Sequence, residues 1–114
     1  MGLDMRMIAL GDMGRIEDEY EWRGNFPILQ LARMFGGPEP DCFEDGSNPI
    51  VLDSDALLCI ANFLSNPILS LHLWGEVGDA EYYDDVIRPI FEEFKDAMDL
   101  SDRRCMDYYF YASY

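Results

Sequence analysis

The chain has 114 residues, of which 49% are hydrophobic and 27% are charged, a composition typical of a folded domain and not of a disordered chain. Its 23 Asp and Glu residues outnumber 8 Lys and Arg and give a formal net charge of -15, which excludes a conventional nucleic-acid-binding protein and disfavours docking on an anionic membrane. No apolar run approaches the roughly 20 residues of a membrane helix, and the start lacks a signal-peptide pattern. We expect a single acidic domain over residues 1–114, located in the cytoplasm.

The N-terminal residues predict a β-hairpin. Residues 5–10 are typical of a short strand, and residues 11–14 carry Gly-Asp-Met-Gly, a turn signal. Residues 15–23 then alternate charged and apolar side chains, which predicts a half-buried strand. Its inner face holds Ile16, Tyr20 and Trp22. Because Asp18 interrupts that face, a short acidic helix is the competing interpretation.

A helix, a loop and a brief strand follow. Asn25 can cap a helix that has Pro27 in its first turn and that ends at Gly36-Gly37, where glycine supplies a left-handed cap. Residues 38–48 predict a loop and residues 49–52 a brief strand. Asp53 or Ser54 then caps a buried helix that runs to about residue 64.

The last third of the chain predicts two strands around a long helix. Alternating leucines predict a strand over residues 68–74. Apolar spacing predicts a helix over residues 79–100 that kinks or restarts at Pro89, and residues 101–104 form a polar break. A final strand covers residues 105–114, with Tyr109 and Tyr111 on its outer side. The predicted core comprises Leu57, Ile60, Leu64, Leu69, Leu71, Leu73, Ile87, Phe91, Phe94 and Phe110.

The resulting order, ββα(β)αβαβ, is an α+β domain with a small mixed or antiparallel sheet and about three helices. The three cysteines, Cys42, Cys59 and Cys105, are odd in number and widely spaced, so we expect free reduced thiols with Cys59 buried as a small hydrophobe. One disulfide, or oxidation of Cys42 on its acidic loop, is the alternative.

No catalytic or ligand-binding motif is present in the sequence. His72 is the only histidine, and the predicted strand places it opposite the leucine face with no nucleophile pattern nearby. Asp53-Ser54-Asp55 and residues 41–48 depart from the calcium-loop pattern, and the glycines lack phosphate-loop spacing. We therefore expect a protein that is not an enzyme, with no metal, no cofactor and no catalytic role for His72.

Acidic side chains are the most distinctive feature of the sequence. Glu81, Asp85, Glu92, Asp96 and Asp99 recur at helical spacing along the predicted long helix and form a stripe that only Arg88 interrupts. Such a stripe either binds a cationic partner or is a solvated face that keeps the protein soluble. Tyr82, Tyr109 and Tyr111 lie near acids and are the predicted aromatic part of the binding surface. The alternative is that these tyrosines complete the second face of the sheet.

In size, charge and absence of a catalytic motif, the chain resembles the small acidic inhibitors of bacteria and their phages. These include anti-CRISPR proteins, inhibitors of restriction or DNA-repair enzymes, and immunity proteins against nuclease toxins. The resemblance implies a basic protein partner, bound through nucleic-acid mimicry or active-site capping, with no direct binding of nucleic acid. The alternative is a non-catalytic adaptor domain of a larger assembly, and the sequence leaves a homodimer open.

Overall fold

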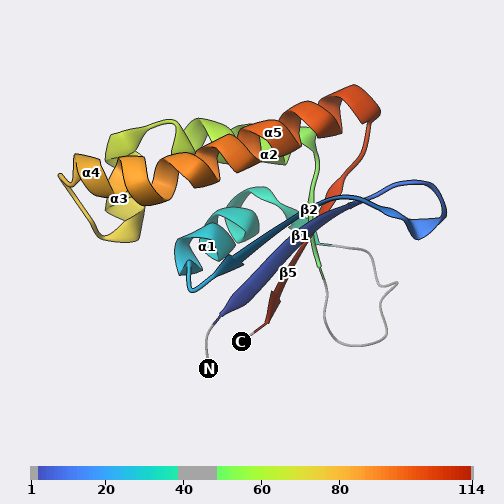
Figure 1. Cartoon of the computed structure of the whole chain (residues 1–114), viewed down its shortest axis with the longest axis horizontal. Coiled ribbons are helices and arrows are strands. Elements are labelled where there is room, and N and C mark those ends of the chain that lie inside the picture. Colours follow the sequence, from blue (N-terminus) through green and yellow to red (C-terminus); the bar gives the residue numbers. More distant parts are fainter. Residues whose placement is uncertain (1–2, 39–48, 114) are drawn as a thin grey trace.

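The computed structural model describes residues 3–38 and 49–113, which form an α+β fold built on an antiparallel sheet (Figure 1). The sheet order is β2-β1-β5-β4-β3. Its four main strands are β1 (Asp4–Leu10), β2 (Ile16–Arg23), β4 (Ile50–Leu52) and β5 (Tyr108–Ser113), and the two-residue β3 (Gly37–Pro38) extends the far edge. The predicted α+β class and antiparallel sheet are thus confirmed.

The hairpin of β1 and β2 forms as predicted. The turn holds a short 3-10 helix, η1 (Asp12–Gly14), and a register shift between Ala9 and Leu10 marks a bulge next to it. The inner face of β2 is less apolar than predicted, because Ile16 beside the turn is 46% exposed. Trp22, at the other end of the strand, is buried.

The helices are α1 (Phe26–Phe35), α2 (Ser54–Leu64), α3 (Pro67–Trp74), α4 (Ala80–Tyr82) and α5 (Arg88–Arg104). Figure 1 shows α2 and α5 running side by side across one face of the sheet, with α1 beneath them. Together with alternate residues of the strands, α1, α2 and α5 bury a common core. The described residues place no helix on the opposite face of the sheet.

The strand predicted over residues 68–74 is wrong, because this segment is helix α3. The Asn66 carboxamide oxygen accepts a hydrogen bond from the Leu69 N–H at 3.1 Å, Pro67 occupies the first turn, and Gly75 ends the helix with a φ of 74°. These start and stop signals outweigh the alternation of leucines. As a result Leu69, a predicted core residue, is 48% exposed, and His72 is an exposed helix residue.

The predicted interruption at Pro89 is confirmed and takes the form of a π-helical turn, η2 (Tyr83–Ile87), between α4 and α5. The Arg88 N–H bonds to the Tyr83 carbonyl five residues back, so the chain passes Pro89 with one extra residue in the turn. The buried Tyr83 hydroxyl donates to the Leu64 carbonyl at 2.6 Å and fixes this turn to the end of α2.

The predicted polar break at residues 101–104 is wrong, since α5 continues through it. Ser101 is buried and its hydroxyl donates to the Met106 carbonyl, whereas the charged residues beside it face solvent. The helix ends instead at Cys105, which has a left-handed φ of 53°. Residues 101–104 are therefore the amphipathic last turn of α5.

Three local predictions also need correction. Gly36 is extended, with a φ of -84°, and does not cap α1 in the left-handed conformation. The Asn25 side chain donates to the Arg23 carbonyl instead of accepting from α1. Cys59 is exposed, because it lies on the outer side of α2. Cys42 and the acids of the 38–48 loop, Glu39, Asp41, Glu44 and Asp45, lie outside the described residues.

Gly36 is expected to be required for packing of α1 against β4. A Cβ atom at this position would lie 2.3 Å from Ile50 Cγ2 and 2.6 Å from the Ala32 carbonyl oxygen, which is backbone and cannot turn away. We predict that Gly36→Ala lowers the free energy of unfolding by about 1–3 kcal/mol. Gly37→Ala is the control, since its Cβ would meet nothing within 4 Å. Equal stabilities of the two variants in urea denaturation would refute this prediction.

Candidate partner-binding surface

Helix α5 lies against the edge strand β2 through one buried tryptophan. The Trp22 ring stacks on Phe94 of α5, with ring centroids 5.2 Å apart and planes within 4°. Its indole N–H donates to Glu93 Oε1 at 3.2 Å. Because Trp22 is in β2 and Phe94 and Glu93 are in α5, this contact brings the acidic side of the helix next to the acidic strand.

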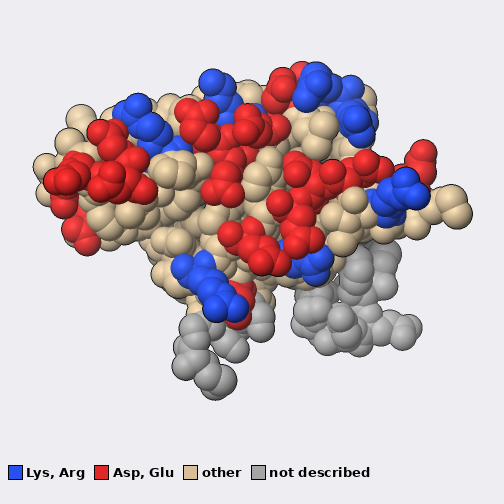
Figure 2. Space-filling model, in the orientation of Figure 1, with Lys and Arg blue, Asp and Glu red and all other residues tan. Residues whose placement is uncertain are grey.

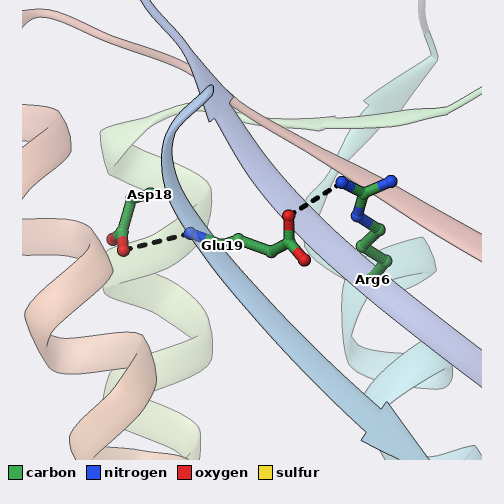
Figure 3. Close-up of polar contacts among 3 residues, drawn as sticks. All are labelled: Arg6, Asp18 and Glu19. Carbon is green, nitrogen blue, oxygen red and sulfur yellow. Dashed lines mark hydrogen bonds and ion pairs between the residues drawn. The ribbon is translucent and has the colours of Figure 1, made fainter. Parts of the chain in front are cut away.

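Asp18, the residue that interrupts the inner face of β2, is held by two hydrogen bonds. The buried Tyr108 hydroxyl donates to Asp18 Oδ2 at 2.6 Å, and the Glu19 N–H donates to Asp18 Oδ1 at 3.1 Å (Figure 3). A carboxylate on the core-facing side of a strand is costly unless such donors compensate it. Asp18 is therefore a satisfied, half-buried acid of β2 that Tyr108 of β5 reaches across Ala9 of β1.

Carboxylates from β2 and α5 raise the pKa of the same tyrosine, Tyr20. Burial raises the pKa of the Tyr20 phenol well above its ordinary value of 10.0, and the nearby charges of Asp18, Asp96 and Glu93 raise it further. Burial likewise raises the pKa of Glu93, although the Trp22 hydrogen bond partly opposes this. The two elements thus place their acids in one electrostatic environment.

The outer side of β2 adds further carboxylates. Glu17, Glu19 and Glu21 are exposed, and the Arg6 guanidinium donates to Glu19 Oε2 at 2.7 Å, which lowers the pKa of Glu19 (Figure 3). Figure 2 shows acids along α5 and a second band of acids along β2 on the same face of the molecule. We call this surface, which wraps around the β2 edge, the α5–β2 acidic face. Asp18, Glu92, Glu93, Asp96 and Asp99 lie on the helix side of the sheet, Glu19 and Glu21 lie on the opposite side of β2, and Glu17 lies at the hairpin turn beside Arg104.

The structure divides the predicted helical stripe into two parts. Glu92, Asp96 and Asp99 lie on α5, whereas Asp85 lies in η2 and Glu81 on α4, and all five are exposed. The extra residue of the π turn shifts the phase of the helix by about 100°, so Glu81 no longer continues the line of the α5 acids. Only the α5 part joins the acids of β2.

Few cations neutralise the α5 acids. Asp99 pairs with Arg103 at 3.2 Å, and Arg88 pairs with Asp84 at 2.8 Å. Among the described residues, neither Glu92 nor Asp96 has a Lys or Arg side chain within ion-pair distance. Glu92 and Asp96 are therefore exposed carboxylates of α5 without a cation in the described part of the chain.

The predicted aromatic residues do not lie with the α5 acids. Tyr109 and Tyr111 are half-buried on the face of the sheet opposite the helices, because they alternate with the core residues Tyr108 and Phe110. Tyr82 is half-buried on α4, on the far side of the π turn. The aromatic side chain that does accompany the acidic face is Tyr20, which the sequence placed on an inner surface.

The described part of the chain shows no cluster of side chains suited to metal binding. No three His, Cys, Asp or Glu side chains in it converge on a common point. An open hollow of about 530 Å³ lies between the hairpin turn and the end of α5, and it contains Arg104, Glu17 and Cys105. Arg104 and Glu17 approach each other there at 3.7 Å, and His72 lies elsewhere, on α3.

Five members of the α5–β2 acidic face were not predicted as site residues: Glu17, Asp18, Glu19, Glu21 and Glu93. The alternation of Glu17, Glu19 and Glu21 did indicate a charged outer face on a strand. That β2 is the sheet edge, and that α5 lies beside it, follow from contacts across 71 residues of sequence such as that of Trp22 with Glu93. Neither fact is encoded in local spacing.

Comparison with protein-family models, with curated proteins and with solved structures finds no match for this chain. Over residues 3–38 and 49–113, no single helix has both the length and the apolar character needed to cross a membrane. Taken together, α2 and α3 have enough apolar length, but a bend of 90° separates them.

The half-buried Glu93 carboxylate predicts a pH-dependent effect on stability. Since its pKa is raised in the folded protein, the ionised form costs stability at neutral pH, and this cost disappears as the pH falls through the raised pKa toward the ordinary value of 4.5. Glu93→Gln removes the charge and keeps an acceptor for Trp22. We predict that Glu93→Gln is more stable than wild type at pH 7 and that this gain vanishes below pH 4.5.

The matched control for this prediction is Glu92→Gln, which removes the same charge from the neighbouring exposed position. It corrects for the relief of general repulsion in a chain of net charge -15. Urea denaturation from pH 4 to 8 provides the measurement. If the two variants have the same stability at every pH, the burial of Glu93 carries no cost.

Proposed function

We propose that this chain is a small acidic inhibitor that binds the basic surface of a nucleic-acid-handling enzyme or complex. The observation that carries the proposal is the α5–β2 acidic face, where a helix and the neighbouring edge strand present eight carboxylates (Figure 2). Arginines pair with three of them, Glu17, Glu19 and Asp99. Enzymes that act on nucleic acids need basic channels for the phosphate backbone. A face of carboxylates is complementary to such a channel.

The mechanism of inhibition is occupation of that channel in place of the nucleic acid. Carboxylates three or four residues apart on a helix are roughly 5–6 Å apart, on the scale of neighbouring phosphates. Long-range attraction between opposite charges raises the rate of association, and desolvated ion pairs then hold the complex. The same charge keeps the inhibitor itself away from DNA and RNA.

A partner can be identified by the way in which it is released. The immobilised protein is incubated with a lysate at about 0.15 M salt, and bound proteins are eluted with a short DNA duplex at constant ionic strength. The proposal requires an eluted protein whose own DNA binding is lost when the free inhibitor is added. If DNA releases nothing, or if the partner binds DNA and this chain together, the inhibitor function is excluded.

Charge reversal on α5 is expected to slow association with that partner. We predict that Glu92→Lys combined with Asp96→Lys lowers the association rate constant by at least about tenfold at low salt, with a smaller change in the dissociation rate. Stability should stay equal or rise slightly, because like charges on the helix repel each other. Stopped-flow association kinetics at several ionic strengths provide the measurement.

The control variant combines Asp55→Lys with Glu76→Lys, two exposed acids outside the α5–β2 acidic face. It changes the net charge by the same amount at different places. Association rates that fall equally in both variants would show that only total charge matters. Rates independent of salt would show that the acids serve solubility alone.

A specific observation supports the adaptor function as a second candidate. Ile68 on α3 is 80% exposed and Val77 in the following loop is 73% exposed, and residues 65–75 contain no charged side chain. Exposed apolar residues of this kind are typical of protein contacts. An adaptor that uses them would bind its partner equally well with the α5 charges reversed.

A further inference from the structure

The outer edge of β2 has unpaired backbone groups whose positions follow from the strand register. The Gly24 N–H bonds to the Leu3 carbonyl at 2.8 Å and continues the ladder between β2 and β1. In an antiparallel pair, alternate residues direct their backbone groups to the partner strand. Trp22, Tyr20 and Asp18 therefore face β1, while Glu19, Glu21 and Arg23 direct their N–H and C=O groups outward.

Side chains cover both ends of this edge and leave its centre open. The outward N–H of Glu19 donates a hydrogen bond to Asp18 Oδ1 at 3.1 Å. The outward carbonyl of Arg23 accepts a hydrogen bond from the Asn25 carboxamide at 3.2 Å. Between them remain the carbonyl of Glu19, the N–H and carbonyl of Glu21, and the N–H of Arg23. The described residues provide no partner for these four groups.

We propose that an extended basic segment of the partner adds to β2 as a short antiparallel strand centred on Glu21. The four open groups match a five-residue segment whose central residue exchanges two hydrogen bonds with Glu21. This inference rests on the proposed inhibitor function for the charge of the partner, and it adds the mode of binding. Backbone bonds then provide a register that a purely electrostatic contact lacks.

Charge complementarity favours basic side chains on both faces of the added strand. The central side chain of the guest lies beside Glu21 on the outer face, because directly paired residues point the same way. The two neighbouring guest side chains point to the helix side, next to Trp22 and Tyr20, where Glu93 and Asp96 lie. Arginine at these three positions meets a carboxylate each time.

A second copy of this chain fits the edge poorly. Antiparallel pairing of β2 with its own copy about Glu21 would set the two Glu21 side chains against each other and bring two acidic faces together. Like charges directly opposite destabilise a strand pair. Acidic side chains along an exposed edge are also a known means of preventing self-association. The edge therefore excludes copies of this chain and admits a cationic strand.

The probe for this inference is a blocked peptide, Thr-Arg-Arg-Arg-Thr, tested on the wild-type protein. In one derivative the central arginine carries an N-methyl group, which removes the donor to the Glu21 carbonyl. In the control derivative the arginine before it is N-methylated, where the N–H points away from β2. Both derivatives keep the charge of the parent peptide, so any difference between them reports the backbone contact.

We expect the central N-methyl group to weaken binding by about tenfold and the control to leave it nearly unchanged. With the parent peptide at ten times its Kd, amide hydrogen exchange of Glu21 and Arg23 should slow about tenfold. Exchange at Trp22, whose N–H faces β1, should not change. These are the results that support strand addition.

Three results would overturn the inference. Equal binding of both N-methylated peptides would show an electrostatic contact only, which leaves the inhibitor function intact. No binding of the parent peptide at millimolar concentration would exclude a basic strand on this edge. Slower exchange at Glu21 that depends on protein concentration without peptide would identify a second copy as the occupant. The inhibitor function fails separately, when DNA releases no partner.

Discussion

The contact between Trp22 and α5 is the interaction on which the acidic face depends. Trp22 stacks on Phe94 and Phe110 and bonds to Glu93, so a single indole ties the edge strand to both the helix and the central strand β5. Truncation of a buried aromatic of this size typically costs about 3–5 kcal/mol. Without it, β2 and α5 would carry the same acids but would not hold them on one face.

The acids at this junction are paired with different compensating groups. Within the described residues, Asp18 accepts hydrogen bonds from the Tyr108 hydroxyl and the Glu19 N–H, Glu19 forms an ion pair with Arg6, and Glu93 accepts a hydrogen bond from the Trp22 indole N–H. Glu92 and Asp96 rely on solvent within the part of the chain that the structure describes. The face therefore combines acids fixed by the fold with acids that have no cation beside them in the described residues, a combination that suits the cationic partner we propose.

Local sequence patterns predicted the elements better than their arrangement. The period-two alternation of β2 and the apolar spacing of α5 identified both elements, because each buries one side against a core. In α3 the alternating leucines competed with Asn66-Pro67 and Gly75, and the capping signals decided the outcome. The prediction of one stripe from Glu81 to Asp99 depended on a regular helix, and the π turn before Pro89 interrupts that regularity. Adjacency of β2 and α5 depends on distant contacts that spacing cannot show.

The claim that β2 and α5 form one binding face can be tested by following amide shifts of the labelled protein during titration with a hexa-arginine peptide. The account predicts that residues 18–23 and 92–99 shift most and follow a single dissociation constant. Residues 76–85, which are also rich in acids but lie before and within the π turn, should shift much less. Equal shifts at residues 76–85, or different dissociation constants for the strand and the helix, would contradict the account.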